Sequence, residues 1–514
     1  MVSGKCRRTA SVAALACCAL AAVLALLPGG AAHAIGFEDV ARRAKTLAGK
    51  SWEKPQPGLP KELSSLTYEQ YRDISFKSDR YLWRGGRLPF EIAFFHTGFY
   101  FDQPVKINEV DAEGVHPIRF NSDDFNYGAN KLDPQKIRDA GFAGFRVHHA
   151  VNTPRIKDEV VVFLGASYFR AVGKNQRYGS AARGLTVDTA ESSGEEYPRF
   201  TEFWLERPAP GDTELVIYAL LDTRSAVGAY RFILHPGTET AMNVKMRLYL
   251  RESVKKLGIA PMSSMYFFGE NQGPPRPDYR PEVHDSDGLS VHAGSGEWIW
   301  RPFVNPKRLL VTSFGTTDPQ GFGVMQRDRA FSSYQDVGGR YELRPSVWVT
   351  PRGKWGPGRV ELVQIPLPDE TNDNIVAYWV PANAPDVKQP FELQYRIAWQ
   401  KDRETRPPLA WVAQSRRGAG YVRNADRGIA FMVDFEGPVF KMLPPDAKIT
   451  GAFSVDGNAQ LIETIAFPNE ATGGWRVSLR LRRIDEKKPI ELRGVLKNGD
   501  ETISETWSYV LPGE

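Results

Sequence analysis

Two acidic stretches hold the side chains with the most potential for catalysis. Residues 280–288 read Arg-Pro-Glu-Val-His-Asp-Ser-Asp-Gly, and residues 369–374 read Asp-Glu-Thr-Asn-Asp-Asn. Cleavage of a glycosidic bond usually needs two carboxyl groups, one protonated to assist the leaving oxygen and one ionised to activate water or attack carbon. The candidates are Glu282, Asp285, Asp287, Asp369, Glu370 and Asp373. The two stretches therefore predict a carbohydrate site, with a pair of solvated turns as the simpler alternative.

Among these carboxylates, Asp373 has the position best suited to a general acid. It lies just before residues 375–380, an apolar run that is typical of a strand. A side chain at a strand end is held rigidly and is partly removed from water. Burial beside a second carboxylate such as Glu370 would raise the pKa of Asp373, as a general acid requires.

The first acidic stretch also offers metal ligands. His284, Asp285, Asp287 and His292 supply nitrogen and oxygen atoms at close spacing, but they complete neither a zinc motif nor a calcium-binding loop. The sequence also contains no Gly-x-Ser-x-Gly motif and no phosphate-binding Gly-x-x-x-x-Gly-Lys loop. We therefore expect no metal and no cofactor.

Tryptophans gather near the acidic stretches. Half of the 12 tryptophans fall between residues 298 and 399, namely Trp298, Trp300, Trp348, Trp355, Trp379 and Trp399. On a strand, Trp298 and Trp300 share one face, where two indoles in line can stack on successive sugar rings. Burial in a β core is the commoner fate of a single tryptophan, but nearby polar loops favour a sugar-binding wall. Trp298, Trp300 and Trp379 are thus candidate substrate-binding residues.

The elements that must position these side chains are mostly strands. Helical periodicity is confined to residues 37–52, 66–74 and 133–140. Elsewhere, runs rich in β-branched and aromatic residues alternate with turns, as in residues 160–172, 200–206, 214–222, 228–235 and 241–251. Residues 179–184 have the composition of a surface loop. Dense strands without intervening helices predict an all-β fold built on a large antiparallel β-sandwich.

The composition changes after about Trp399. Residues 401–408 are charged and contain proline, and residues 416–420 are basic and rich in glycine. Residues 428–512 then contain about seven short strand candidates, which fits a small immunoglobulin-like β-sandwich. We therefore expect a large β-sandwich over residues 35–401 that holds the carbohydrate site and a smaller β-sandwich over residues 402–514.

Residues 1–34 have the pattern of an export signal. Lys5, Arg7 and Arg8 precede an apolar run over residues 12–27, and Ala-His-Ala at residues 32–34 matches a small-x-small cleavage site. All 3 cysteines lie in this leader, so the mature chain is expected to form no disulfide. The leader carries basic but no acidic residues, which leaves a nearly neutral chain and favours a neutral partner over nucleic acid.

Five segments together resemble one known family. They are residues 90–96 (Phe-Glu-Ile-Ala-Phe-Phe-His), 280–288, 297–302 (Glu-Trp-Ile-Trp-Arg-Pro), 321–328 (Gly-Phe-Gly-Val-Met-Gln-Arg-Asp) and 370–379 (Glu-Thr-Asn-Asp-Asn-Ile-Val-Ala-Tyr-Trp). With these segments the chain resembles the glucans biosynthesis protein G/D family of osmoregulated periplasmic glucan synthesis, over essentially the whole mature length. The resemblance implies a periplasmic protein with a mutarotase-like β-sandwich followed by an immunoglobulin-like one. The leader lacks a convincing twin-arginine motif, which favours the protein G branch.

The resemblance also implies an activity and a site. Members of the family look like glycoside hydrolases that cleave or rearrange β-1,2-glucan by inversion. The resemblance places the acid on Asp373 and the water-activating carboxylate on Asp285, with Glu370, Tyr341 and Arg344 lining the site. In an inverting site the two carboxyl groups stand roughly 6.5 to 9.5 Å apart, unless further waters relay the proton.

Two questions stay open at this point. The register of the first acidic loop is not fixed, so Asp287 remains an alternative base to Asp285. The function is either that of an inverting β-1,2-glucanase or transglycosylase, or that of a non-catalytic glucan-binding factor beside an inner-membrane glucosyltransferase. Both functions need an aromatic cleft that tolerates carboxylates, so only release of reducing ends from β-1,2-glucan separates them.

Overall fold

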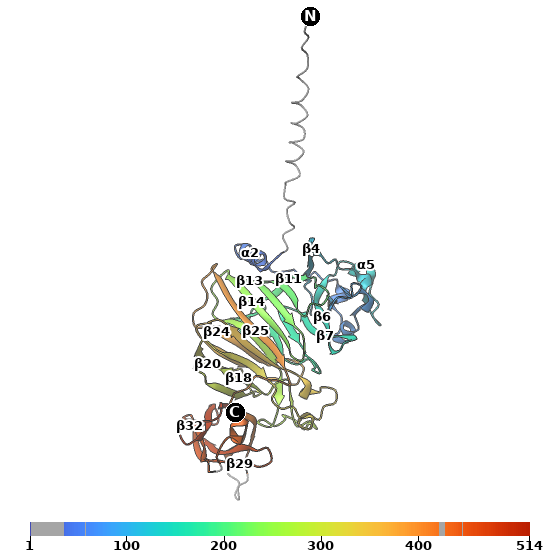
Figure 1. The fold of residues 1–514 in the computed structure, drawn as a ribbon. Helices are drawn as coiled ribbons and strands as arrows, with labels where there is room; N and C mark the ends of the chain where they lie inside the picture. Colours follow the sequence, from blue (N-terminus) through green and yellow to red (C-terminus); the bar gives the residue numbers. More distant parts are fainter. Residues whose placement is uncertain (2–34, 57, 421–426, 445, 514) are drawn as a thin grey trace.

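The structure, a computed structural model, describes residues 1, 35–56, 58–420, 427–444 and 446–513 and is built mainly of strands (Figure 1). This confirms the all-β fold class. The leader expected over residues 1–34 lies outside the described residues, apart from Met1. Within the described ranges, no helix combines the length and the apolar character needed to cross a membrane.

Ten strands form the first large sheet of the described chain. In spatial order they are β2 (Phe90–His96), β6 (Phe142–Thr153), β7 (Ile156–Leu164), β8 (Tyr168–Ala171), β9 (Ala181–Arg183), β15 (Leu257–Ser264), β24 (Ile375–Pro381), β23 (Pro357–Gln364) and β20 (Leu310–Thr317), with β10 (Leu185–Val187) also paired to β15. The strand expected over residues 160–172 is split in two at Gly165, whose φ of 74° allows the tight turn between β7 and β8. The surface loop expected over residues 179–184 is wrong, because β9 lies there between β8 and β15.

A second large sheet of 15 strands spans most of the described chain. In spatial order it contains β28 (Ile449–Val455), β31 (Ile490–Asn498), β33 (Thr506–Leu511), β19 (Trp298–Pro302), β18 (Gly288–His292), β21 (Gly321–Met325), β22 (Ser346–Arg352), β25 (Pro390–Gln400), β14 (Thr240–Leu250), β13 (Ala226–His235), β12 (Leu215–Asp222), β11 (Arg199–Glu206), β3 (Lys106–Asp111) and β4 (Gly114–Pro117), with β32 (Glu501–Thr502) beside β31. The pairs are antiparallel except for β11 with β3 and β19 with β33. Figure 1 shows β13, β14 and β25 side by side in the middle of this sheet.

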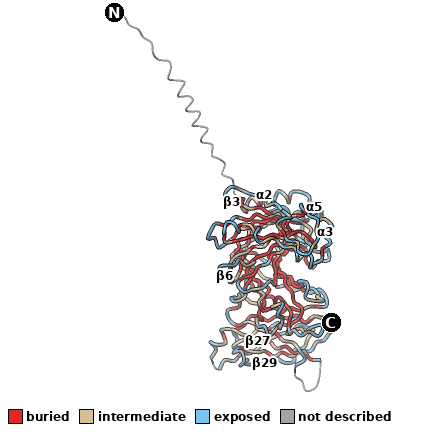
Figure 2. Tube along the Cα trace, turned by 90° about the vertical axis from the view of Figure 1, so that its right-hand side faces the viewer, coloured by how far each residue is buried: buried red, intermediate tan, exposed pale blue. Residues whose placement is uncertain are grey.

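The two large sheets face each other through a common core. Phe145 of β6 and Phe163 of β7 meet Phe203 of β11 and Phe232 of β13 edge to face, with ring centroids 5.0 and 5.3 Å apart. Strand β14 illustrates the alternation behind this arrangement, because every second side chain from Met242 enters the core while those between point the other way. The buried segments, red in Figure 2, accordingly run through the middle of the molecule.

Helices are few and short, as expected. Among the residues that the structure describes, the α-helices are α2 (Phe37–Ala48), α3 (Lys61–Ser64), α4 (Tyr68–Arg72), α5 (Pro134–Ile137) and α6 (Phe331–Tyr334), and the 3-10 turns are η2 (Ser78–Arg80), η3 (Ser122–Asp124), η4 (Tyr341–Leu343) and η5 (Pro438–Lys441). Helix α2 buries Phe37, Val40 and Ala44 against the outer face of the second sheet. Its apolar stripe therefore covers the side of β12 and β13 that the main core leaves open.

The last part of the described chain contains the expected succession of short strands. A separate sheet is formed by β26 (Trp411–Gly418), β27 (Gly428–Glu436), β30 (Gly474–Arg483) and β29 (Ala459–Asn469), while β28, β31, β32 and β33 join the second large sheet. Two small ribbons pair β1 (Ser75–Phe76) with β5 (Phe125–Asn126) and β16 (Tyr266–Phe268) with β17 (Val283–His284).

The junction between the two expected units is continuous in space. Strand β33 pairs in parallel with β19 through Trp507 and Trp300, so the second large sheet crosses the boundary expected near residue 402. A buried ion pair between Arg327 and Glu505 adds a polar contact across the same boundary. The boundary itself stays a prediction, as do the mutarotase-like and immunoglobulin-like descriptions of the two units.

Candidate functional site

A cleft of about 880 Å³ lies against the first large sheet. Strands β7, β8 and β9 contribute part of its wall, and Asp285, Arg344 and residues 370–373 contribute another part. Tyr68, Tyr100 and Tyr197, from three other segments of the chain, are also among the lining residues. The cleft thus brings together the two acidic stretches that the sequence singled out.

Asp373 lies two residues before the start of β24, as its position before an apolar run predicted. The next residue, Asn374, fixes this strand end, because its side chain accepts a hydrogen bond from the backbone N–H of Tyr266 at 2.8 Å and donates one to the Tyr266 carbonyl at 3.0 Å. The Asp373 carboxyl itself is open to solvent in the cleft although protein surrounds it on several sides. This desolvation, together with the negative charge of Asp285, raises the pKa of Asp373 to about 6.

Asp285 lies deeper in the cleft and is paired with a cation. Its side chain is buried and forms an ion pair with the guanidinium of Arg344. Burial raises the pKa of Asp285, and the Arg344 charge counteracts this effect by favouring the ionised form. The Arg344 guanidinium also lies 4.0 Å from the centre of the Tyr341 ring, which holds it from a second side.

The other two residues implied by the resemblance have different positions. Glu370 lines the cleft but is exposed, and it pairs with Arg280 at 2.7 Å. Tyr341 is buried beneath Arg344 and stacks on Tyr334 at 5.7 Å between ring centroids. The carboxylate that acts on Asp373 is therefore Asp285, and not Glu370 as the sequence had indicated.

The structure places Asp287 away from the cleft. Its Oδ2 atom accepts hydrogen bonds from the backbone N–H groups of Arg327 at 3.0 Å and Asp328 at 3.2 Å. The neighbouring carboxylates of Glu270, Glu282 and Asp328 bring oxygen atoms within 4.8 Å of one another. Asp287 thus belongs to a second acidic group, which we call the inner acidic group and define as Glu270, Glu282, Asp287 and Asp328.

Three carboxyl groups of the inner acidic group have raised pKa values, which reduces the repulsion among them. The Nε2 atom of His284 lies 2.8 Å from a carboxylate oxygen of Glu282. Burial and the charge of Glu282 raise the pKa of Glu270 to about 8, and burial raises the pKa of Glu282 and of Asp287 to about 7. Near neutral pH, Glu270, Glu282 and Asp287 therefore retain part of their protons, and the inner acidic group carries less negative charge than it would if all three were ionised.

Raised pKa values make stability depend on pH. The folded state binds these protons more tightly than the unfolded chain, so the stability linked to them is fully present below about pH 4 and is lost as the pH rises through about 7 to 8. Glu270→Gln removes the group with the highest pKa, and we expect its melting temperature to fall less than that of the wild type between pH 5 and 8.5. Scanning calorimetry checks this, with the exposed Glu470→Gln as control. Equal slopes for all three proteins would contradict the assignment.

The three tryptophans chosen from the sequence do not line the cleft. Trp300 and Trp379 are buried, and Trp298 stacks on His292 at 4.1 Å and on Trp348 at 5.6 Å between ring centroids. Trp298 and Trp300 do share one face of β19, but that face packs into the second hydrophobic core with residues of β27 and β33. Their face is covered by the C-terminal strands, which the local pattern did not reveal.

The aromatic wall of the cleft consists instead of tyrosines that sequence analysis missed. Tyr100, Tyr197 and Tyr68 retain 82%, 60% and 57% of their surface exposed, although large apolar rings are usually covered. They come from segments far apart in the sequence, so no local pattern joins them. Tyr68 begins helix α4, Tyr100 lies in a turn and Tyr197 lies in an irregular segment, so they share no local sequence signal.

The geometry suits a reaction that needs two unlike carboxyl groups. Asp373 is solvent-accessible and retains its proton to a higher pH than an ordinary aspartate. Asp285 faces an arginine that favours its ionised form. An acid and a base on one polar, tyrosine-lined cleft match what cleavage of a glycosidic bond requires.

Comparison with known proteins decides the family. The model of the family described as "Periplasmic glucan biosynthesis protein, MdoG" matches residues 35–511. The chain belongs to the MdoG family. A relative from Ralstonia nicotianae, "Glucans biosynthesis protein G", is 60% identical over 95% of this chain and 98% of its own length. The protein of the same name from Serratia proteamaculans is 49% identical over 96% of each chain.

Membership of the MdoG family confirms the resemblance drawn from the five sequence segments. Both relatives bear the protein G name, in agreement with the branch that the leader favoured. The match also covers the residues of both expected units.

Proposed function

We propose that this chain is a periplasmic protein of glucan biosynthesis that acts on the β-1,2-glucan backbone by inverting cleavage or transglycosylation. The observation that carries the proposal is the pair formed by Asp373 and Asp285 in one cleft, with a raised pKa on the first and an arginine partner on the second. The family's description as periplasmic and as acting in glucan biosynthesis supports the compartment and the substrate class.

In the proposed reaction each carboxyl group moves one proton. The protonated Asp373 carboxyl donates to the glycosidic oxygen, and the bond from that oxygen to the anomeric carbon breaks. The Asp285 carboxylate takes a proton from a water molecule, whose oxygen attacks the anomeric carbon from the opposite face. A sugar hydroxyl in place of that water gives transglycosylation with the same proton transfers.

Release of reducing ends from linear β-1,2-glucan tests the proposal. Purified mature chain is incubated with the polymer, and reducing ends and product lengths are followed with time. New reducing ends support cleavage, and longer chains without new ends support transglycosylation. Binding of the polymer without either change would favour the second candidate, a glucan-binding factor beside an inner-membrane glucosyltransferase, which the exposed tyrosines of the cleft also suit.

Tyr100 is proposed as a sugar-stacking residue of the cleft. A ring that covers roughly 50 Å² of sugar surface at about 25 cal/mol per Å² contributes about 1.3 kcal/mol, or close to tenfold in Kd. We therefore expect Tyr100→Ala to weaken binding of linear β-1,2-glucan about tenfold by calorimetry. Phe467→Ala is the matched control, because Phe467 is an exposed aromatic on β29 and lines no part of the cleft. Equal affinities for both variants would exclude Tyr100 from binding.

The division of labour along the chain is part of the same proposal. Residues 35–401 would supply the cleft, and residues 402–514 would form a smaller immunoglobulin-like unit. In support, the residues that line the cleft all precede residue 402. The pairing of β33 with β19 predicts that the smaller unit depends on the larger one for part of its fold.

A further inference from the structure

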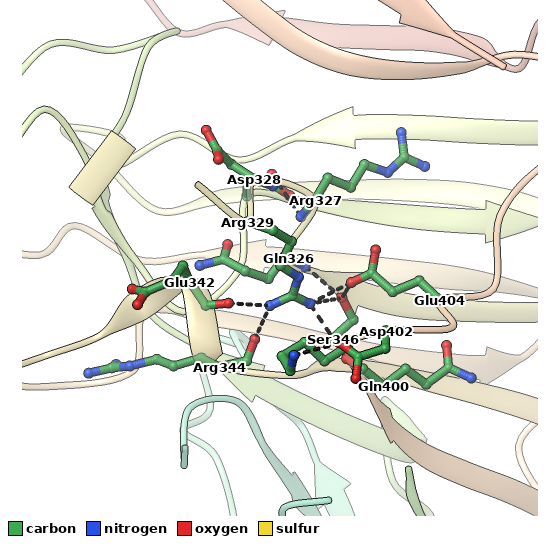
Figure 3. Close-up of polar contacts among 12 residues, drawn as sticks. Gln326, Arg327, Asp328, Arg329, Glu342, Arg344, Ser346, Gln400, Asp402 and Glu404 are labelled. Atoms are coloured by element: carbon green, nitrogen blue, oxygen red, sulfur yellow. Dashed lines mark hydrogen bonds and ion pairs between the residues drawn. The ribbon is translucent and has the colours of Figure 1, made fainter. Parts of the chain in front are cut away.

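Arg329 lies between the Asp285–Arg344 pair and residues 401–408, which join the two expected units and are called the joining segment below. Figure 3 shows its guanidinium at the centre of a group of polar contacts. One side donates to the backbone carbonyl oxygens of Glu342, at 3.3 Å, and of Arg344. The other side pairs with Glu404 and donates to the Ser346 hydroxyl at 3.2 Å. A single side chain therefore ties the turn η4 to the joining segment.

Glu404 anchors this arrangement from the joining segment. Its side chain retains only 1% of its surface exposed. Although burial opposes ionisation, the charges of Arg329 and Arg406 hold the pKa of Glu404 below its usual range. The Ser346 hydroxyl donates to the same carboxylate, so Glu404 fixes Arg329 with both charge and hydrogen bonding.

The backbone held by Arg329 carries the side chain that contacts Asp285. In Figure 3 the Arg344 carbonyl points toward Arg329, and the Arg344 side chain extends away from it. That side chain leads into the cleft, where it pairs with Asp285. A shift of residue 344 by a fraction of an ångström would change the contact between its guanidinium and Asp285.

We propose that Arg329, held by Glu404, is a positioning residue that keeps Arg344 in contact with Asp285. The proposal rests on the catalytic role of Asp285 given above. It makes the segment near residue 404, which contacts no substrate in the cleft, a determinant of the rate. The charged or titratable groups around Asp285 are Arg344, Arg170, His284 and Asp373, and of these only Arg344 is bound through its backbone by Arg329.

The experiment compares Arg329→Met with Arg329→Lys on linear β-1,2-glucan. In Arg329→Met we expect kcat to fall about tenfold while KM stays within about twofold, because the substitution disturbs the proposed base Asp285 and leaves the tyrosines of the cleft unchanged. The acidic limb of the kcat/KM profile should move to higher pH, because Arg344 no longer favours the ionised form of Asp285. Arg329→Lys keeps the charge and one donor, and should recover part of both losses.

Glu505→Gln supplies a matched control. It breaks the charge of a second buried ion pair, with Arg327, two residues before Arg329 and across the same boundary. We expect it to lower the melting temperature and to leave the acidic limb in place. Glu404→Gln, which keeps the shape of its side chain, gives the milder form of the Arg329 change if Arg329→Met fails to fold.

The outcomes separate the positioning role from the proposed function. A lower melting temperature with an unmoved acidic limb in both Arg329→Met and Glu404→Gln would overturn the positioning role. Absence of turnover in the wild type would instead overturn the proposed function. Positioning is then read from crystal structures of the wild type and Arg329→Met, where an Arg344 guanidinium that stays on Asp285 in the variant argues against it and a displaced one supports it.

Discussion

Asp373→Asn should turn over linear β-1,2-glucan about a hundredfold more slowly than the wild type, or slower still, while its affinity for the polymer is kept. Asparagine has the size of aspartate and part of its hydrogen bonding, but it delivers no proton to the leaving oxygen. The substitution removes the carboxyl group whose raised pKa lets it carry a proton near pH 6. Initial rates of reducing-end release and calorimetric binding measure the two effects.

The pH profile of the wild type gives an independent check on Asp373. A general acid must be protonated, so kcat/KM should fall as the pH rises through about 6, the pKa of Asp373. Asp369→Asn is the matched control for Asp373→Asn, because Asp369 belongs to the same loop but accepts a hydrogen bond from Thr371 and does not line the cleft. A wild-type rate in Asp373→Asn would remove this residue from the mechanism.

The parts of the fold that depend on local pattern were predictable. Strand β14 alternates buried and half-buried side chains in its middle, and β27 to β33 follow one another at the short spacing of a small β unit. Strand β9 was missed because Ala181–Arg183 has no β-branched residue, and its pairing with β8 and β15 outweighs its weak propensity. The parallel pairing of β19 with β33 joins residues about two hundred positions apart, which no local signal records.

The site shows the same limit. Asp373 was identified from the local sequence, because an acidic residue just before an apolar strand is expected to be held rigidly and partly removed from water. Asp285 and Arg344 were named as site residues by the resemblance, but their ion pair was not predicted, because it depends on how the loop after β17 meets the turn η4. The tyrosine wall was missed because Tyr68, Tyr100 and Tyr197 meet only in the folded chain.

The choice between Asp285 and Asp287 was open in the sequence and has a geometric basis in the structure. The backbone N–H of Asp285 donates to Met265 at 2.7 Å, and that of Asp287 donates to Met325 at 2.8 Å, so the two residues follow different neighbours. In an extended segment, side chains two positions apart lie on the same side, but a bend after β17 separates these two. Asp285 enters the cleft, and Asp287 joins the inner acidic group.

Asp285→Asn and Asp287→Asn should therefore differ in turnover by about a hundredfold. Asparagine at position 285 takes no proton from water and leaves the Arg344 charge without its partner, so kcat should fall about as far as in Asp373→Asn. Asparagine at position 287 contacts no substrate, and turnover should stay within severalfold of the wild type, about 1 kcal/mol in barrier height.

Rates alone do not distinguish a lost base from a damaged fold, so melting temperatures accompany them. Removing the Asp287 carboxyl relieves repulsion within the inner acidic group, and the melting temperature of Asp287→Asn at pH 8 should equal or exceed that of the wild type. Asp285→Asn should bind the polymer and melt as one cooperative unit while turnover is lost. The reverse pattern, an active Asp285→Asn and an inactive, well-folded Asp287→Asn, would transfer the role of base to Asp287 and require its loop to adopt another register during catalysis.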